Sequence, residues 1–244
     1  SELEENACPT AGSCQGLYTA NTMACLTEVL GMSLPECATA PAVSSLKKRI
    51  AFDSGYRAVE LVNEQLLPRD IITKSSLRNA ILCDYALGGS TNSFLHLLAI
   101  AHAGDIDLQL NDFEELSSMI KQIVQLDPTA LPNMTDFHNA GGISGLMRVI
   151  SENIDEFSNT LSITGEKIKN IIKNAKYKPE LIHSPKNPIT TQPGLCVLYG
   201  NIEPDGCVIK ISGVDESCYY FKGRAKVFDS EEESMNALEN DEIK

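Results

Sequence analysis

The sequence of 244 residues predicts a mixed fold of the α+β or α/β class, in which a long helical part precedes a shorter β-rich, barrel-like part. Apolar residues recur at helical spacing through the first two thirds of the chain. Prolines then cluster between residues 179 and 193, and short β-branched or aromatic runs follow. We therefore expect one domain over residues 1–178, a Pro-rich linker over 179–193 and the beginning of a second domain over 194–244.

Proline and glycine divide the helical part into segments. Pro35 and Pro68 end the first two apolar patterns, Gly88-Gly89 separates the third from the fourth, and Gly104 ends the fourth. The second pattern places on one stripe the residues Leu46, Ile50, Val59, Val62 and Leu66. The expected helices cover residues 15–34, 44–67, 75–87, 91–103, 112–124, 143–151 and 166–175.

Short strands are expected in the last quarter of the chain. Turn residues separate them at Pro204-Asp205-Gly206 and at Lys222-Gly223-Arg224. A final helix over residues 230–238 opens with three glutamates, which complement the positive end of the helix dipole. The expected strands cover residues 195–199, 207–211 and 218–221.

The charge balance limits the partners of the chain. Twenty Lys and Arg residues against 33 Asp and Glu leave a net charge of −13, which repels nucleic acids and anionic membrane surfaces. No apolar run is long enough for a membrane span and the start is acidic rather than signal-like, so we expect a cytoplasmic protein. Eight cysteines in a chain of this length are expected to be reduced thiols. Residue 1 is not Met and the last helix ends with the sequence, so we expect an internal fragment.

Cys8 and Cys14 are the first candidates for chemistry. They flank a Pro-, Gly- and Ser-containing turn directly before a helix, where the free backbone N–H groups favour a thiolate that could bind iron or attack an electrophile. Their five-residue gap alone leaves two interpretations open, a ligand pair or ordinary loop thiols.

The turn Gly89-Ser90-Thr91-Asn92 is the second candidate. At a helix start its N–H groups and hydroxyls could hold a carboxylate or phosphate, or it could simply cap the helix, and both interpretations stay open. His96 and His102 do not share a helical face, so we predict no metal pair there. His138 is expected to serve a turn, bonded locally near Asp136. The remaining cysteines are predicted to lie in apolar or loop positions (Cys25, Cys37, Cys83) or to pack within strands (Cys196, Cys207, Cys218).

The wording of several segments resembles the dihydroxy-acid dehydratase family, the iron–sulfur dehydratases that also include phosphogluconate and sugar-acid dehydratases. The similar segments occur in the family's order and span nearly the whole chain. They are Cys8-Pro9-Thr10-Ala11-Gly12-Ser13-Cys14, Thr19-Ala20-Asn21-Thr22-Met23, Gly88-Gly89-Ser90-Thr91-Asn92, His138-Asn139-Ala140-Gly141-Gly142 and Pro204-Asp205-Gly206 with Lys210.

The resemblance implies a homodimeric hydro-lyase that converts 2,3-dihydroxy acids to 2-oxo acids in valine and isoleucine biosynthesis. It implies an iron–sulfur cluster, [2Fe-2S] or [4Fe-4S], with Cys14 as one of three cysteine ligands and Cys8 as its neighbour, and a Mg²⁺ ion. Gly89, Ser90, Thr91 and Asn92 are the residues expected to contact the substrate. The base serine and the other ligands match no residue here, so we expect this chain alone to be inactive. The alternatives are a dehydratase for aldonates or 6-phosphogluconate, and a non-catalytic binding remnant.

Overall fold

The computed structural model describes residues 14–243, so Cys8 lies outside the described residues. The chain divides into two compact units, one ending at Gly213 and one beginning at Val214. The class predicted from the sequence is confirmed: helices dominate the first part and a small sheet follows. No helix of the described residues is long and apolar enough to cross a membrane.

The first unit is built from helices whose ends follow local sequence signals. Ser44 accepts the Lys47 N–H at the start of α3, and Gly88 adopts the left-handed conformation that ends α5. The helices are α2 (Thr19–Val29), α3 (Ser45–Glu64), α4 (Pro68–Ile71), α5 (Lys74–Leu87), α6 (Asn92–Ala103), α7 (Leu110–Ser117), α8 (Met134–Asn139), α9 (Gly142–Asn153) and α10 (Ile168–Ile172).

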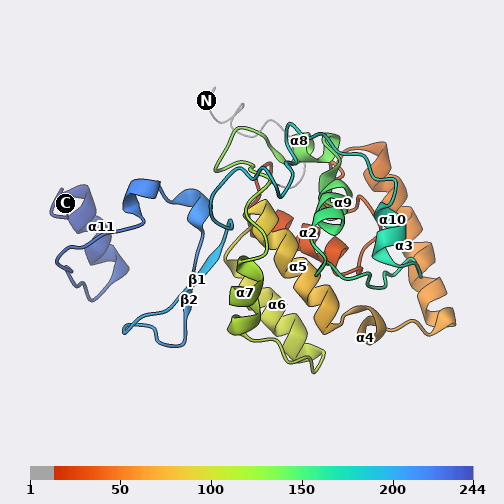
Figure 1. Cartoon of the computed structure of the whole chain (residues 1–244), viewed down its shortest axis with the longest axis horizontal. Coiled ribbons are helices and arrows are strands. Elements are labelled where there is room, and N and C mark those ends of the chain that lie inside the picture. Colours follow the sequence, from red (N-terminus) through yellow and green to blue (C-terminus); the bar gives the residue numbers. More distant parts are fainter. Residues whose placement is uncertain (1–13, 244) are drawn as a thin grey trace. The chain divides into compact units, whose positions relative to one another are not determined.

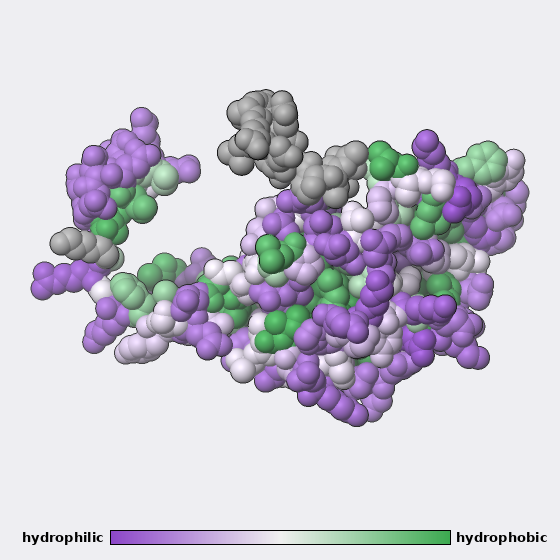
Figure 2. All heavy atoms as spheres, turned by 90° about the horizontal axis from the view of Figure 1, so that it is seen from above, coloured by the Kyte–Doolittle hydropathy of each residue, from purple (hydrophilic) through white to green (hydrophobic). Residues whose placement is uncertain are grey.

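Helix α5 is the centre of the first unit. Every residue from Ser76 to Leu87 except Arg78 is buried, and the helix contacts α2, α6, α7 and α9 (Figure 1). Around it, Phe94 stacks on Phe113 with ring centroids 4.3 Å apart. The Tyr85 hydroxyl donates to the Phe113 carbonyl at 2.8 Å, which satisfies the polar group of a buried ring. The face seen in the space-filling view is largely hydrophilic, with hydrophobic groups in separate patches (Figure 2).

The apolar residues of helix α3 do not share one face, although the sequence predicts that they do. Ile50 is buried at 7% exposure, whereas Val59 and Val62 are 63% and 76% exposed. At about 100° per residue, Val59 stands half a turn of the helix away from Ile50, so the two cannot share a face. The prediction of one stripe is therefore wrong, and an apolar face of α3 points away from the core.

A β-hairpin completes the first unit. β1 (Cys196–Leu198) pairs antiparallel with β2 (Cys207–Ile209), Cys196 opposite Ile209, and a short 3₁₀ turn η1 (Ile211–Gly213) follows. Leu195 and Val197 are buried with the helices. The predicted domain boundary at 179–193 stays a prediction.

The second unit contains η2 (Glu216–Cys218) and α11 (Glu231–Glu239), which Ser230 caps. The strand expected at 218–221 is wrong, because no strand forms among the described residues there. Instead the Asp215 carboxylate accepts the Ser217 N–H at 2.9 Å and the Ser217 hydroxyl, a local bond that favours a turn over an extended chain.

Candidate functional site

Cys14 lies in the loop just before α2. The residue is exposed, and the buried Asn21 side chain donates to the carbonyls of Cys14 and Gly16, each at 2.7 Å. The Leu17 N–H donates to the Asp127 carbonyl, which fixes the end of the loop. The motif residue Asn21 therefore holds the backbone beneath the thiol in place.

The turn from Gly88 to Asn92 is held by two threonines of α2. Thr19 Oγ1 lies 3.0 Å from Ser90 Oγ and accepts from the Asn92 side-chain amide at 2.8 Å. The Ser90 N–H donates to Thr22 Oγ1 at 3.2 Å. The structure thus joins the turn to the first residues of α2, the helix that directly follows the Cys14 loop.

Thr19 and Thr22 belong to a segment that carries the family resemblance, but the sequence analysis assigned neither of them a role at the turn. Their spacing of three residues at a helix start was the available signal, since it places both on one side of the helix. Thr91 occupies the N-cap position of α6 but makes no side-chain cap bond, while Ser90 Oγ accepts the Asn92 N–H. The choice between an anion site and a plain helix start at Gly89 to Asn92 stays open.

A buried carboxyl lies behind the turn. Asp84 is 1% exposed and accepts a hydrogen bond from the Ser93 hydroxyl, whereas its Oδ1 has no partner among the described residues. Burial raises the pKa of Asp84 to about 7. Gly89 packs on it so closely that a Cβ there would lie 2.1 Å from Asp84 Oδ1.

Lys210 connects the hairpin to the same turn. Its ammonium donates to the carbonyls of Gly88 and Gly89 at 2.7 and 2.9 Å. These carbonyls lie at the C-terminal end of α5, where the helix dipole favours a cation. Partial burial lowers the pKa of Lys210, and the nearby Asp84 opposes that shift.

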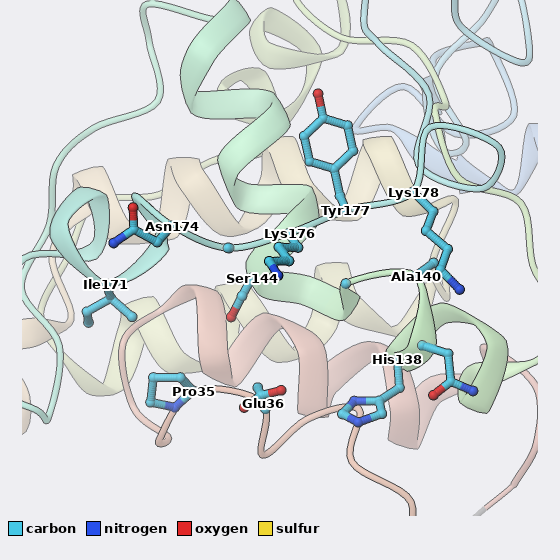
Figure 3. Close-up of a pocket in the computed structure, with 13 residues that line it drawn as sticks. Pro35, Glu36, His138, Ala140, Ser144, Ile171, Asn174, Lys176, Tyr177 and Lys178 are labelled. Atoms are coloured by element: carbon cyan, nitrogen blue, oxygen red, sulfur yellow. The ribbon is translucent and has the colours of Figure 1, made fainter.

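The His138 segment lines a separate cavity of about 680 Å³ (Figure 3). His138 Nδ1 lies 3.0 Å from the Oγ1 of Thr39, which is distant in sequence. Asp136 instead accepts the Asn133 N–H and belongs to the cap of α8, so the predicted local bond of His138 is wrong. The cavity is lined by Pro35, Glu36, residues 138–141, Ser144, Ile171 and residues 174–178.

Glu28 supports one wall of this cavity from inside the protein. Its carboxylate accepts the N–H groups of Glu36 and Ala38 at 2.9 and 3.0 Å and the Ser144 hydroxyl at 3.1 Å. Burial raises its pKa to about 7, although these hydrogen bonds oppose the shift. The sequence analysis missed this role, because the sequence around a glutamate in an apolar helix does not indicate which groups its carboxylate will bond.

The other cysteines divide by exposure. Cys25 and Cys83 are fully buried, and burial raises the pKa of both thiols. Cys207 and Cys218 are exposed, so the prediction that they pack as small hydrophobes within strands is wrong. His96 lies exposed on α6, as does His102.

Within residues 14–243, no set of three or more His, Cys, Asp or Glu side chains is placed to hold a metal ion. Cys14 offers one accessible thiol, which suits a single ligand position. By themselves, the described residues do not fit an iron–sulfur cluster or a magnesium site.

Comparison with known proteins reveals similarity along the whole chain. Residues 1–171 match the family described as Dihydroxy-acid/6-phosphogluconate dehydratase N-terminal, and residues 180–244 match its C-terminal counterpart. The dihydroxy-acid dehydratases of Endomicrobium trichonymphae and Methanospirillum hungatei are each 47% identical over 100% of this chain and 44% of their own length. That of Citrifermentans bemidjiense is 46% identical over 96% of this chain and 42% of its length.

This chain thus spans less than half the length of these curated relatives. The two matched regions nevertheless leave only residues 172–179 unmatched. The chain belongs to the dihydroxy-acid/6-phosphogluconate dehydratase family.

Proposed function

We propose that this chain serves a hydro-lyase that dehydrates a 2,3-dihydroxy acid to a 2-oxo acid, as in valine and isoleucine biosynthesis. The observation that carries the proposal is the identity of 46–47% to dihydroxy-acid dehydratases along essentially the whole chain. In this reaction the C2 proton and the C3 hydroxyl leave as water. The resulting enol tautomerises to the oxo acid.

Cys14 is assigned as one thiolate ligand of an iron–sulfur cluster, [2Fe-2S] or [4Fe-4S]. Its exposure and the Asn21 hydrogen bonds beneath it support this role, since a cluster ligand has to be accessible and held in place. Cys8 lies outside the described residues and keeps only its sequence-based assignment as a neighbour. When bound, the cluster iron would supply a Lewis acid, and Mg²⁺ would offset the negative charge on carboxylate oxygens.

The turn at Gly89, Ser90, Thr91 and Asn92 is assigned to the substrate. Its hydrogen bonds to Thr19 support a positioned turn close to the start of α2. Ser90 and Asn92 already use side-chain atoms in these bonds. The contact offered to an acidic substrate therefore rests mainly on Thr91 and on backbone N–H groups.

The assembly is proposed as a cytoplasmic homodimer of two-domain chains, with domains at 1–178 and 194–244 and the linker at 179–193. The family resemblance supports the homodimer. The net charge of −13 favours a small-molecule substrate over nucleic acid or a membrane surface.

The test uses the longest natural polypeptide that contains this chain. With matched amounts of 2,3-dihydroxy-3-methylbutanoate, an aldonate and 6-phosphogluconate, we expect the branched dihydroxy acid to be dehydrated with the highest kcat/KM. Preferred turnover of a sugar acid would assign the chain to the alternative branch. Absence of any turnover in iron-loaded protein would favour a binding remnant.

Cys14→Ser, compared with Cys207→Ser, tests the ligand assignment. Both thiols are exposed, so the pair controls for general thiol loss. We expect Cys14→Ser to lose bound iron and sulfide as well as activity, and Cys207→Ser to keep them. The 244-residue chain alone is expected to retain no visible cluster absorption after desalting.

A further inference from the structure

A chain of polar contacts runs from a buried carboxyl to the turn assigned to the substrate. The Ser93 hydroxyl lies within hydrogen-bond distance of Asp84 Oδ2 and 2.7 Å from the Ser90 carbonyl oxygen. Ser93 is fully buried and Asp84 is 1% exposed, so bulk water does not compete for either side chain. The Asp84 carboxyl therefore reaches the backbone of Ser90 through a single hydroxyl.

The two contacts of this hydroxyl need one more proton than an ionised carboxylate leaves available. A serine hydroxyl carries one hydrogen, whereas an ionised Asp84 and the Ser90 carbonyl can only accept. With an ionised Asp84, the Ser93 hydroxyl donates to one of the two oxygens and not to the other. With a neutral Asp84, the acid donates to Ser93 Oγ and the Ser93 hydroxyl donates to the Ser90 carbonyl, so both contacts are hydrogen bonds.

The surroundings of Asp84 favour the neutral acid. Its Oδ1 has no hydrogen-bond partner among the described residues, and Gly89 packs closely against this oxygen. Burying an ionised oxygen without a partner costs more free energy than burying a neutral one. Burial accordingly raises the pKa of Asp84 to about 7, while the bond to Ser93 and the charge of Lys210 oppose the shift.

Lys210 supplies the positive charge near Asp84. Among the described residues, the other titratable groups that interact with Asp84 are Cys25 on α2 and its own neighbours on α5, Cys83 and Tyr85. Burial raises the pKa of these three groups, which keeps them neutral near pH 7. The Asp84 carboxyl is therefore the group beneath the turn whose charge changes around neutral pH.

We propose that Asp84 is a positioning residue of the turn assigned to the substrate and acts as a neutral acid, which holds the Ser90 carbonyl through the Ser93 hydroxyl. When Asp84 loses its proton to solvent, the Ser93 hydroxyl turns to the carboxylate. The Ser90 carbonyl then keeps the bond from the Ser93 N–H, at 3.0 Å, but loses the bond from the hydroxyl. The effect on substrate rests on the proposed function, whereas the hydrogen-bond chain does not.

Nuclear magnetic resonance of the 244-residue chain between pH 5 and pH 9 tests the hydrogen-bond chain. The carbonyl carbon of Ser90 reports the bonds to its oxygen, and the carboxyl carbon of Asp84 reports the proton. We expect the two resonances to titrate with the same midpoint. In Ser93→Ala the Ser90 resonance should no longer follow the titration of Asp84, because the connecting hydroxyl is gone.

Asp84→Asn separates the role of the proton from the role of packing. Asparagine has the shape of the acid and keeps an N–H that donates to Ser93 Oγ at every pH, so the Ser90 resonance should stay at its low-pH position. His96→Gln is the control, because His96 is an exposed titratable residue one turn along α6 from Ser93. This control should leave the Ser90 titration unchanged. The parent chain and Ser93→Ala decide the question even where Asp84→Asn folds poorly.

The role in substrate binding is measured in the longer natural polypeptide. Above the midpoint we expect the KM for the dihydroxy acid to rise about two- to tenfold, the effect of one lost hydrogen bond. Asp84→Asn should keep the low KM across the range, with the same pH profile of kcat as the parent. An unchanged KM profile in Asp84→Asn would remove the role in substrate binding, and absence of any turnover would count against the proposed function alone.

Two results would overturn the hydrogen-bond chain itself. One is a Ser90 resonance that stays constant between pH 5 and pH 9, or that titrates with a midpoint different from that of Asp84. The other is a Ser90 titration that persists with the parent midpoint in Ser93→Ala or in Asp84→Asn.

Discussion

The backbones of Gly194 and Gly88 lie directly against each other. A Cβ added to Gly194 would fall 2.2 Å from the Cα of Gly88 and 2.8 Å from its nitrogen. This contact brings the entrance of the β-hairpin onto the end of α5, beside the turn assigned to the substrate.

Gly194→Ala should therefore destabilise the first unit. The clash is with backbone, which cannot swing aside, so we expect a loss of about 1–3 kcal/mol in the free energy of unfolding. Gly200→Ala is the matched control, because its Cβ would meet no described atom within 4 Å. Urea unfolding gives the comparison, and equal midpoints for the two variants would contradict the close contact.

Lys210→Met should loosen the hairpin. The variant removes two hydrogen bonds from the Lys210 ammonium to the Gly88 and Gly89 carbonyls. Because this ammonium is partly exposed, we expect the free energy of unfolding to fall by about 1.5 kcal/mol, the low end for hydrogen bonds of charged groups. Amide hydrogen exchange of residues 196–209 should accelerate more than that of α9. Lys186→Met, at an exposed position, should leave the exchange rates unchanged.

Glu28→Gln should change how stability depends on pH. Burial raises the pKa of the folded carboxyl to about 7, above the ordinary glutamate value of 4.5, so the folded state binds more protons than the unfolded state between these values. Stability contributed by Glu28 is therefore full below about pH 4.5 and falls as the pH rises to 7, by at most about 1.4 kcal/mol per pH unit.

Urea midpoints measured from pH 5 to pH 8 test this. Glu28→Gln lowers stability overall, because its amide cannot accept from both neighbouring N–H groups, but its decline between pH 5 and 7 should be shallower than in the parent chain. Asp84, with its pKa also raised to about 7, contributes a decline of the same sign that both chains retain. The exposed control Glu203→Gln should keep the full slope, and a parallel slope in Glu28→Gln would refute the assignment.

Thr19→Val should disturb the turn without disturbing the helix. Valine keeps the branched shape but removes the partner of Ser90 and Asn92, at a cost of about 1 kcal/mol. In the longer natural polypeptide, the proposed function predicts a higher KM for the dihydroxy acid. Thr27→Val, which loses only an intrahelical bond to Met23, should cost similar stability and leave KM unchanged.

Local signals in the sequence predicted much of the fold. Glycines at 88 and 104 place the end of α5 and the end of α6 where the structure has them. Pro68, interpreted as a stop, also opens α4, because proline is favoured in the first turn of a helix. The short helix α8 was missed although Asn133 and Asp136 form a capping box at its start.

Long-range pairing accounts for one of the errors. The helix expected over 112–124 ends at Ser117, because the N–H groups of Ile123 and Val124 bond instead to the Ala86 carbonyl of α5. On the site, the motifs indicated Cys14 and the Gly89–Asn92 turn. Their connection through Thr19 joins residues 71 positions apart, a distance over which periodicity and turn signals carry no information.

The bond between Lys210 and Gly88 links residues 122 positions apart, which has a consequence for synthesis. At 5–20 residues per second, the ribosome adds Lys210 roughly 6–24 s after Gly88. The carbonyls at the end of α5 therefore lack the Lys210 ammonium during this interval. The nascent helices have already had time to collapse by then. The contact of Lys210 with the turn assigned to the substrate is therefore among the last contacts of the first unit that can form, whereas the bonds of that turn to Thr19 and Thr22 can form earlier.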